Sequence, residues 1–108
     1  MRKEMIRIRF CRRGGEIVGF RVKGHAGFAE SGQDIVCASV TSAVQMAANG
    51  LTECAGLPAD LSVHEGDISL RCEGGGEGAK LLFESLYLQL SLLAQDYPKN
   101  IVITDTEV

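Results

Sequence analysis

The sequence predicts an α+β fold in which two helices pack on a sheet of about five strands. Three observations lead to this prediction. Residues 4–23 alternate as a hairpin does, residues 34–55 and 79–96 are two long and mainly apolar segments, and short alternating segments lie between and after them. The expected order is β-β-α-β-β-α-β, in one domain that spans residues 1–108.

The first hairpin is predicted by period-two alternation. Residues 4–11 (EMIRIRFC) and 16–23 (EIVGFRVK) each alternate apolar with polar side chains, and Gly14-Gly15 supplies the positive φ angles that a tight turn needs. The side chains expected on the inner face are Ile6, Ile8, Phe10, Val18, Phe20 and Val22. The Arg and Lys residues of this hairpin would discourage edge-to-edge pairing with another sheet.

The first helix is expected to begin near Asp34 and to run to about Ala55, where Gly56 and Pro58 stop it. Either residues 31–34 form a capping box, or Asp34 is itself the N-cap. The polar residues form one narrow stripe: Ser39, Ser42, Gln45, Asn49 and Glu53. Nearly all other residues are apolar or small, so we expect this helix to be largely buried.

The second half of the chain repeats the pattern of hairpin and helix. Residues 61–65 and 68–73 are expected to be strands around a Gly66-Asp67 turn, and a last strand covers 101–104. The core stripe of the second helix is Leu82, Phe83, Leu86, Leu90 and Leu93. Leu81, Leu88 and Leu92 form a second apolar stripe, which indicates either a dimer interface or a deep core under the sheet.

Composition limits the class of protein. The chain has 108 residues, of which 45% are hydrophobic and 23% are charged, as in globular domains. We expect no apolar run long enough to span a bilayer and no signal or transit peptide in MRKEMIRIRF, hence a cytoplasmic protein. The four cysteines form no CxxC motif and have no histidine pair nearby, so we expect no metal, no cofactor and no disulfide framework.

Basic residues are concentrated at the start of the chain. Eight of the eleven Lys and Arg residues lie in residues 1–23, although the net charge is −3. One interpretation is a basic hairpin that contacts RNA or a ribosomal partner. We favour a second one, in which Arg7, Arg9, Arg21 and Lys23 form a solvated strand face, because no aromatic residue interleaves with them for base stacking. We therefore expect no nucleic-acid partner.

A histidine and a cysteine flank a glycine-containing loop at residues 24–33. His25 follows the second strand, and Cys37 lies in the first turn or two of the first helix. The dipole and unpaired N–H groups of a helix start favour a thiolate and can hold an oxyanion. The two residues can thus form the nucleophile and base of a cysteine hydrolase. Taken alone, the spacing fits ordinary packing as well, and the glycines indicate a mobile loop.

The residue pattern of this segment also resembles that of a known family. GHA at 24–26 and GQDIVCASVTS at 32–42 resemble the bacterial ribosomal-processing cysteine protease family (Prp), which is marked by a GHA loop and a G-x-DIVCAAVS-like helix start. The resemblance implies His25 as general base and Cys37 as nucleophile. Gly24 and Asp34 match other motif positions, with Asp34 capping the helix or orienting the site. Ser39 and Thr41 depart from the usual Ala and Ser, but Thr41 keeps a hydroxyl one turn after Cys37.

The resemblance also implies a substrate and an assembly state. Proteases of this family remove a short hydrophobic N-terminal extension from large-subunit ribosomal protein number twenty-seven, and they are dimeric. We therefore expect a cofactor-free, cytoplasmic endopeptidase with a Cys37–His25 dyad, which acts as a homodimer on a ribosomal protein. The alternative is a non-enzymatic ribosome- or RNA-associated binding domain that uses its basic N-terminal hairpin.

Overall fold

The computed structural model describes residues 5–24 and 31–108, with the side chains of residues 31–34 outside the described part. Its elements follow the predicted order. They are β1 (Ile6–Arg13), β2 (Glu16–Lys23), α1 (Ser31–Asn49), the π-helical turn η1 (Gly50–Cys54), β3 (Asp60–His64), β4 (Asp67–Arg71), α2 (Gly76–Asp96) and β5 (Ile101–Glu107). The predicted α+β fold class is confirmed.

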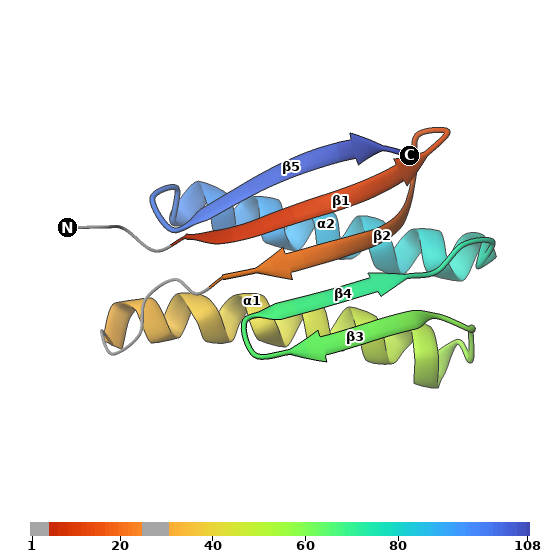
Figure 1. Cartoon of the computed structure of the whole chain (residues 1–108), viewed down its shortest axis with the longest axis horizontal. Coiled ribbons are helices and arrows are strands. Elements are labelled where there is room, and N and C mark those ends of the chain that lie inside the picture. Colours follow the sequence, from red (N-terminus) through yellow and green to blue (C-terminus); the bar gives the residue numbers. More distant parts are fainter. Residues whose placement is uncertain (1–4, 25–30) are drawn as a thin grey trace.

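The five strands form one mixed sheet in the order β3-β4-β2-β1-β5. Neighbouring strands are antiparallel except β5, which runs parallel to β1. Both helices lie on one side of this sheet, with α2 behind the β1–β2 hairpin and α1 behind β4 and β3 (Figure 1). The basic hairpin is therefore central, and β3 and β5 are the edges. The Arg and Lys residues of the hairpin therefore do not protect a sheet edge, because β1 and β2 are central strands.

The core lies between the sheet and the helices. Ile6, Ile8 and Phe10 of β1 are at most 1% exposed, as their alternation predicts. The inner faces of the two helices meet them with a further set of buried side chains: Val36, Val40, Val44, Ala47, Ala79, Phe83, Leu86 and Leu90. Full burial of one such large side chain contributes roughly 1.5–3 kcal/mol, so this layer supplies most of the driving force for folding.

The first helix differs from its prediction at both ends. Because α1 begins at Ser31, Asp34 is the fourth residue of the helix and not its N-cap. At the other end the Ala55 N–H donates to the Gly50 carbonyl over 2.8 Å, which is the five-residue spacing of a π-helix. A Cβ on Gly50 would lie 3.0 Å from Leu82 Cδ2. Glycine at this position therefore allows η1 and α2 to approach closely.

The expectation that the first helix is largely buried is wrong. Ile35 is 59% exposed and Met46 is 55% exposed, because a single helical layer leaves the outer side of each helix uncovered. Residues Ile35–Cys54 are also long and apolar enough to cross a membrane by length and composition. This corrects the expectation that no run is long enough. In the structure, however, Val36, Val40 and Val44 of this helix are core residues.

The second leucine stripe of α2 lies on the surface. Leu81, Leu88 and Leu92 are 69%, 61% and 46% exposed. The interpretation of these residues as a deep core under the sheet is therefore wrong. Exposure leaves the dimer interpretation open as a prediction.

Candidate active site

Cys37 is the seventh residue of α1 and is half-buried. On its inner side it packs against the hydrophobic core. It also borders a small cavity of about 110 Å³ whose wall includes Gly24, Thr41, Gly66 and Asp67. The end of β2, the second turn of α1 and the β3–β4 turn therefore converge around this thiol.

Gly24 follows the last residue of β2, and its backbone requires glycine for two reasons. Its φ angle is +97°, and a Cβ at this position would lie 2.5 Å from the carbonyl oxygen of Met5. An L side chain would be strained by both the angle and the overlap. The Gly24 N–H donates to the Gly66 carbonyl over 2.8 Å, which fixes the point from which the chain continues to His25.

Thr41 follows Cys37 by four residues, so it lies one helical turn further along the same face of α1. It is exposed and borders the same small cavity. The hydroxyl that the family resemblance singles out is therefore next to the cavity of the thiol.

The structure brings together three of the five predicted site residues, namely Gly24, Cys37 and Thr41. His25 lies outside the described residues, as does most of the loop that contains it, so the predicted dyad and the predicted mobility of the loop stay predictions. The backbone of Asp34 is helical, whereas its side chain lies outside the described part.

The position of Cys37 within α1 limits what the start of this helix can contribute to the site. In an α-helix only the first four N–H groups lack an intrahelical acceptor, and the dipole acts mainly within the first turn. Here α1 begins at Ser31, so those N–H groups precede that of Asp34, and Cys37 lies at the end of the second turn. Cys37 therefore lies beyond the first turn, where the helix dipole mainly acts. Oxyanion donors at the helix start would have to come from the N–H groups that precede that of Asp34.

One contact near the cavity was not predicted from the sequence. Arg21 donates two hydrogen bonds to Asp67, of 3.0 Å from Nε and 2.7 Å from an Nη atom. The hydrogen bond from Arg21 holds the pKa of Asp67 below its usual value. The pair joins β2 to β4 beside the Gly24–Gly66 contact. Its members are far apart in the sequence, and only the pairing of β2 with β4 reveals them.

The other thiols differ from Cys37 in their surroundings. Cys54 is exposed at the far end of the first helix, Cys11 is half-buried on β1, and Cys72 is buried just after β4. Burial raises the pKa of Cys72. All four cysteines carry thiols and not disulfides. Within residues 5–24 and 31–108, no group of three or more His, Cys, Asp or Glu residues is arranged to hold a metal ion.

Comparison with known proteins identifies a family from the sequence. The family profile described as cysteine protease Prp matches residues 5–102. The ribosomal processing cysteine protease Prp of Bacillus subtilis (strain 168) is 35% identical over 95 residues, which cover 82% of this chain and 85% of that protein.

Two solved structures share the fold. SMU.848 from Streptococcus mutans superposes with a TM-score of 0.88 at 30% identity, over 96% of both chains. The ribosomal processing protease Prp from S. aureus, in complex with a covalently linked product peptide, has a TM-score of 0.86 at 22% identity, over 94% of this chain and all of that one. From the profile match and the Bacillus relative, the chain belongs to the cysteine protease Prp family.

Proposed function

We propose that this protein is a cytoplasmic endopeptidase that removes the N-terminal extension of large-subunit ribosomal protein number twenty-seven, with Cys37 as nucleophile and His25 as general base. Residues 1–108 would form one protease domain that acts as a homodimer. The relative from Bacillus subtilis is named as a ribosomal processing protease. The S. aureus relative has been crystallised with a substrate peptide and with a covalently linked product peptide. These two facts support the choice of substrate class.

The observation that carries the proposal is the convergence on one small cavity. Cys37 borders it from α1, and Gly24 borders it from the end of β2. The residue after Gly24 in the chain is His25. Gly24, which borders the same cavity as Cys37, is therefore joined by one peptide bond to the proposed base, His25. In a cysteine hydrolase the imidazole must come within hydrogen-bond reach of the thiol.

The reaction then proceeds in two halves. His25 takes the proton from the Cys37 thiol, and the thiolate sulfur forms a bond to the scissile carbonyl carbon. The tetrahedral intermediate collapses as the C–N bond breaks, and protonated His25 donates its proton to the leaving amine. Water, deprotonated by His25, attacks the thioester that remains. The C–S bond breaks, the N-terminal fragment leaves as a carboxylic acid, and the thiol is restored.

The test is cleavage of the purified precursor of the ribosomal protein, followed by intact mass. We expect wild-type protein to release one N-terminal fragment, while Cys37→Ser and His25→Ala lower the rate by at least about 10³-fold. Cys54→Ser is the matched control, because it removes the exposed thiol at the other end of the same helix. Near wild-type cleavage by Cys37→Ser would refute the assignment of the nucleophile. A precursor left intact by active wild-type protease would refute the substrate.

A further inference from the structure

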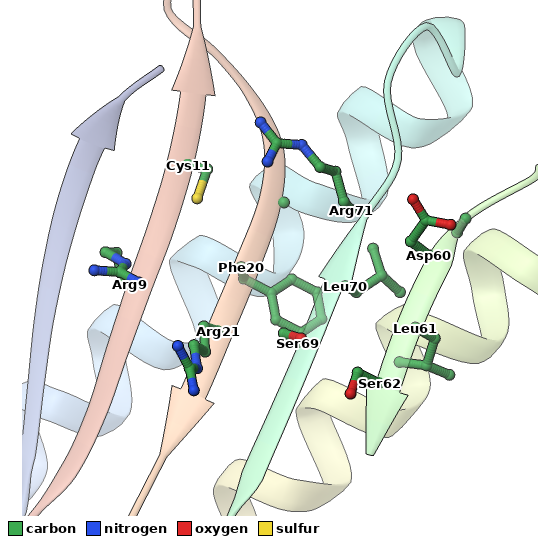
Figure 2. Close-up of a pocket in the computed structure, with 12 residues that line it drawn as sticks. Arg9, Cys11, Phe20, Arg21, Asp60, Leu61, Ser62, Ser69, Leu70 and Arg71 are labelled. Carbon is green, nitrogen blue, oxygen red and sulfur yellow. The ribbon is translucent and has the colours of Figure 1, made fainter. Parts of the chain in front are cut away.

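Basic side chains gather on the side of the sheet that faces away from the helices. Arg7 is the register partner of Lys23, and Arg9 is the partner of Arg21, so four cations face one another across β1 and β2. Figure 2 shows Arg9 and Arg21 on these neighbouring strands, with Arg71 on β4 beyond them. We call these five residues the basic sheet face. Like charges directly opposite each other destabilise a sheet, so this cluster does not serve stability.

Pairing with acidic groups leaves much of this charge uncompensated. On the basic sheet face, Arg21 pairs with Asp67 and Arg71 pairs with Glu73. Within the described part of the chain, Arg7, Arg9 and Lys23 form no salt bridge, although Lys23 acts on Asp67 through space.

Cations elsewhere are compensated more completely. Arg12 pairs with Asp105 and Glu84, Arg13 with Glu73, and Lys80 with Glu16. Of the four cations without a salt bridge in the described part of the chain, Arg7, Arg9 and Lys23 therefore lie together in the centre of the open side of the sheet, and Lys99 lies between α2 and β5.

This surface is also hollowed. One open hollow of about 590 Å³ is bordered by Arg9, Arg21 and Arg71 and by the hydroxyls of Ser62 and Ser69. The carboxylate of Asp60, the register partner of Arg71, also borders it. A second, of about 310 Å³, is bordered by Arg7, Lys23, Val102 and Thr104 as well as by Arg9 and Arg21. Because the two hollows share Arg9 and Arg21, they form one trough across the strands. Its lining combines guanidinium, ammonium and hydroxyl groups with apolar surface and one carboxylate, that of Asp60.

The side chains of the trough favour phosphate over a protein partner. Interfaces between proteins rely on aromatic or large apolar anchors in their centre. The aromatic residues of β1 and β2, Phe10 and Phe20, are instead buried on the opposite side of the sheet, at 0% and 2% exposed. Without aromatic platforms, base stacking is excluded as the main source of affinity. Guanidinium groups bind phosphate through paired N–H donors, and hydroxyls can add further hydrogen bonds.

In contrast to the expectation from the sequence that no nucleic acid binds, we propose that the basic sheet face binds the phosphate backbone of RNA without reading its base sequence. The choice of RNA rests on the proposed function, because a protease that acts on a ribosomal protein meets its substrate beside RNA. The face lies on the side of the sheet away from α1, which carries Cys37 (Figure 1). RNA bound there would bring the protease to assembling ribosomes.

The test is fluorescence anisotropy with a short labelled oligouridine RNA, in potassium chloride from about 50 to 200 mM. Neutralising about three phosphates predicts a slope of about −2 for log K against log salt. Arg7→Thr/Arg9→Thr should weaken binding about tenfold and reduce the slope by about 1.4. Arg7→Lys/Arg9→Lys should retain most of the binding. Lys80→Thr/Lys99→Thr, which removes the same charge from α2 and the segment after it, should bind like wild type.

The fold of these variants is checked by circular dichroism, and cleavage of a peptide substrate should be unchanged in all of them. Intact cleavage without RNA binding would overturn this inference and leave the proposed function standing. Equal weakening by both double threonine variants would also overturn it, because net charge alone would then explain the binding. Displacement of RNA by polyglutamate at lower concentration than by unlabelled RNA would overturn it in favour of an acidic protein.

Discussion

The backbone N–H of Gly24 donates a hydrogen bond of 2.8 Å to the carbonyl oxygen of Gly66. This bond joins the end of β2 to the turn between β3 and β4, within the wall of the cavity that Cys37 borders. The Met5 carbonyl oxygen also lies only 2.5 Å from the position that a Cβ on Gly24 would take. The residue before His25 is thus held from two sides, which sets where the chain leaves the sheet towards the proposed base.

Gly24→Ala tests this anchor. At φ +97° and with a Cβ 2.5 Å from the Met5 oxygen, we expect a loss of about 2 kcal/mol or more in the free energy of unfolding and of most of the cleavage rate. Gly15→Ala is the control, since its φ is also positive, at +85°, but nothing lies within 4 Å of the new Cβ. Urea unfolding and cleavage assays should separate the two. Equal effects of the two variants would mean that the close approach to Met5 is unimportant.

Thr41→Val should lower kcat/KM by about tenfold, the effect of losing one hydrogen bond of about 1 kcal/mol or slightly more near the reacting thiol. The reason is that Thr41 borders the same cavity as Cys37. Thr41→Ser keeps the hydroxyl and should retain the wild-type rate. Because Thr41 is exposed, neither variant should change stability much. A Val variant as active as the Ser variant would show that the hydroxyl has no part in the reaction.

The thiols should react in an order that their surroundings set. Exposed Cys54 should be alkylated quickly without loss of activity, and buried Cys72, whose pKa is raised by burial, should react last. Inactivation by iodoacetamide should follow modification of Cys37 alone, measured by peptide mapping. The Cys54→Ser protein removes the fast reaction and should be inactivated at the wild-type rate. Inactivation that follows Cys54 instead would contradict this prediction.

The elements were predictable because their signals are local. Period-two alternation located the central hairpin, and Ile6, Ile8 and Phe10 are buried as that pattern requires. The helix start was misplaced because Asp34 has the residue type of an N-cap, while the helix begins at Ser31. The sequence pattern predicts that only the polar stripe of α1 is exposed. No local signal indicates that Ile35 lies on the outer side of this helix, which no second layer covers.

The site was predictable only in part, because its geometry depends on long-range pairing. The GHA and DIVCA segments pointed to Gly24 and Cys37. The contributions of Gly66 and Asp67 to the wall of their cavity follow from the antiparallel pairing of β2 with β4. The sequence showed these two residues only as a turn. Likewise, the opposition of Arg9 to Arg21 follows from strand register, and composition shows only that the hairpin is basic.

Acid should weaken the fold in part through Asp67. The hydrogen bond from Arg21 lowers the pKa of Asp67 from its usual 3.8. The stability that this pair contributes is therefore present above pH 3.8 and is lost as the pH falls through the lower pKa of the folded state. Asp67→Asn should lower stability at neutral pH and lose less on acidification than wild type does. Asp60→Asn, at the exposed start of the neighbouring strand β3, is the control. Parallel stability curves for wild type and Asp67→Asn would contradict the prediction.

The last prediction is a dimer that forms through the outer face of α2. Leu81, Leu88 and Leu92 are exposed on this helix, and a contiguous apolar stripe on a small domain is most stable when a second copy covers it. Light scattering should show a dimer, and Leu88→Glu should weaken it by about 2 kcal/mol or more, since a charge would enter a desolvated contact. Gln89→Glu adds the same charge beside the stripe and should leave the dimer intact. Because β3 and β5 are the free edges of the sheet, pairing through strands is the competing arrangement. A Leu88→Glu protein that stays dimeric would favour those edges, and a monomeric wild type at high concentration would exclude both.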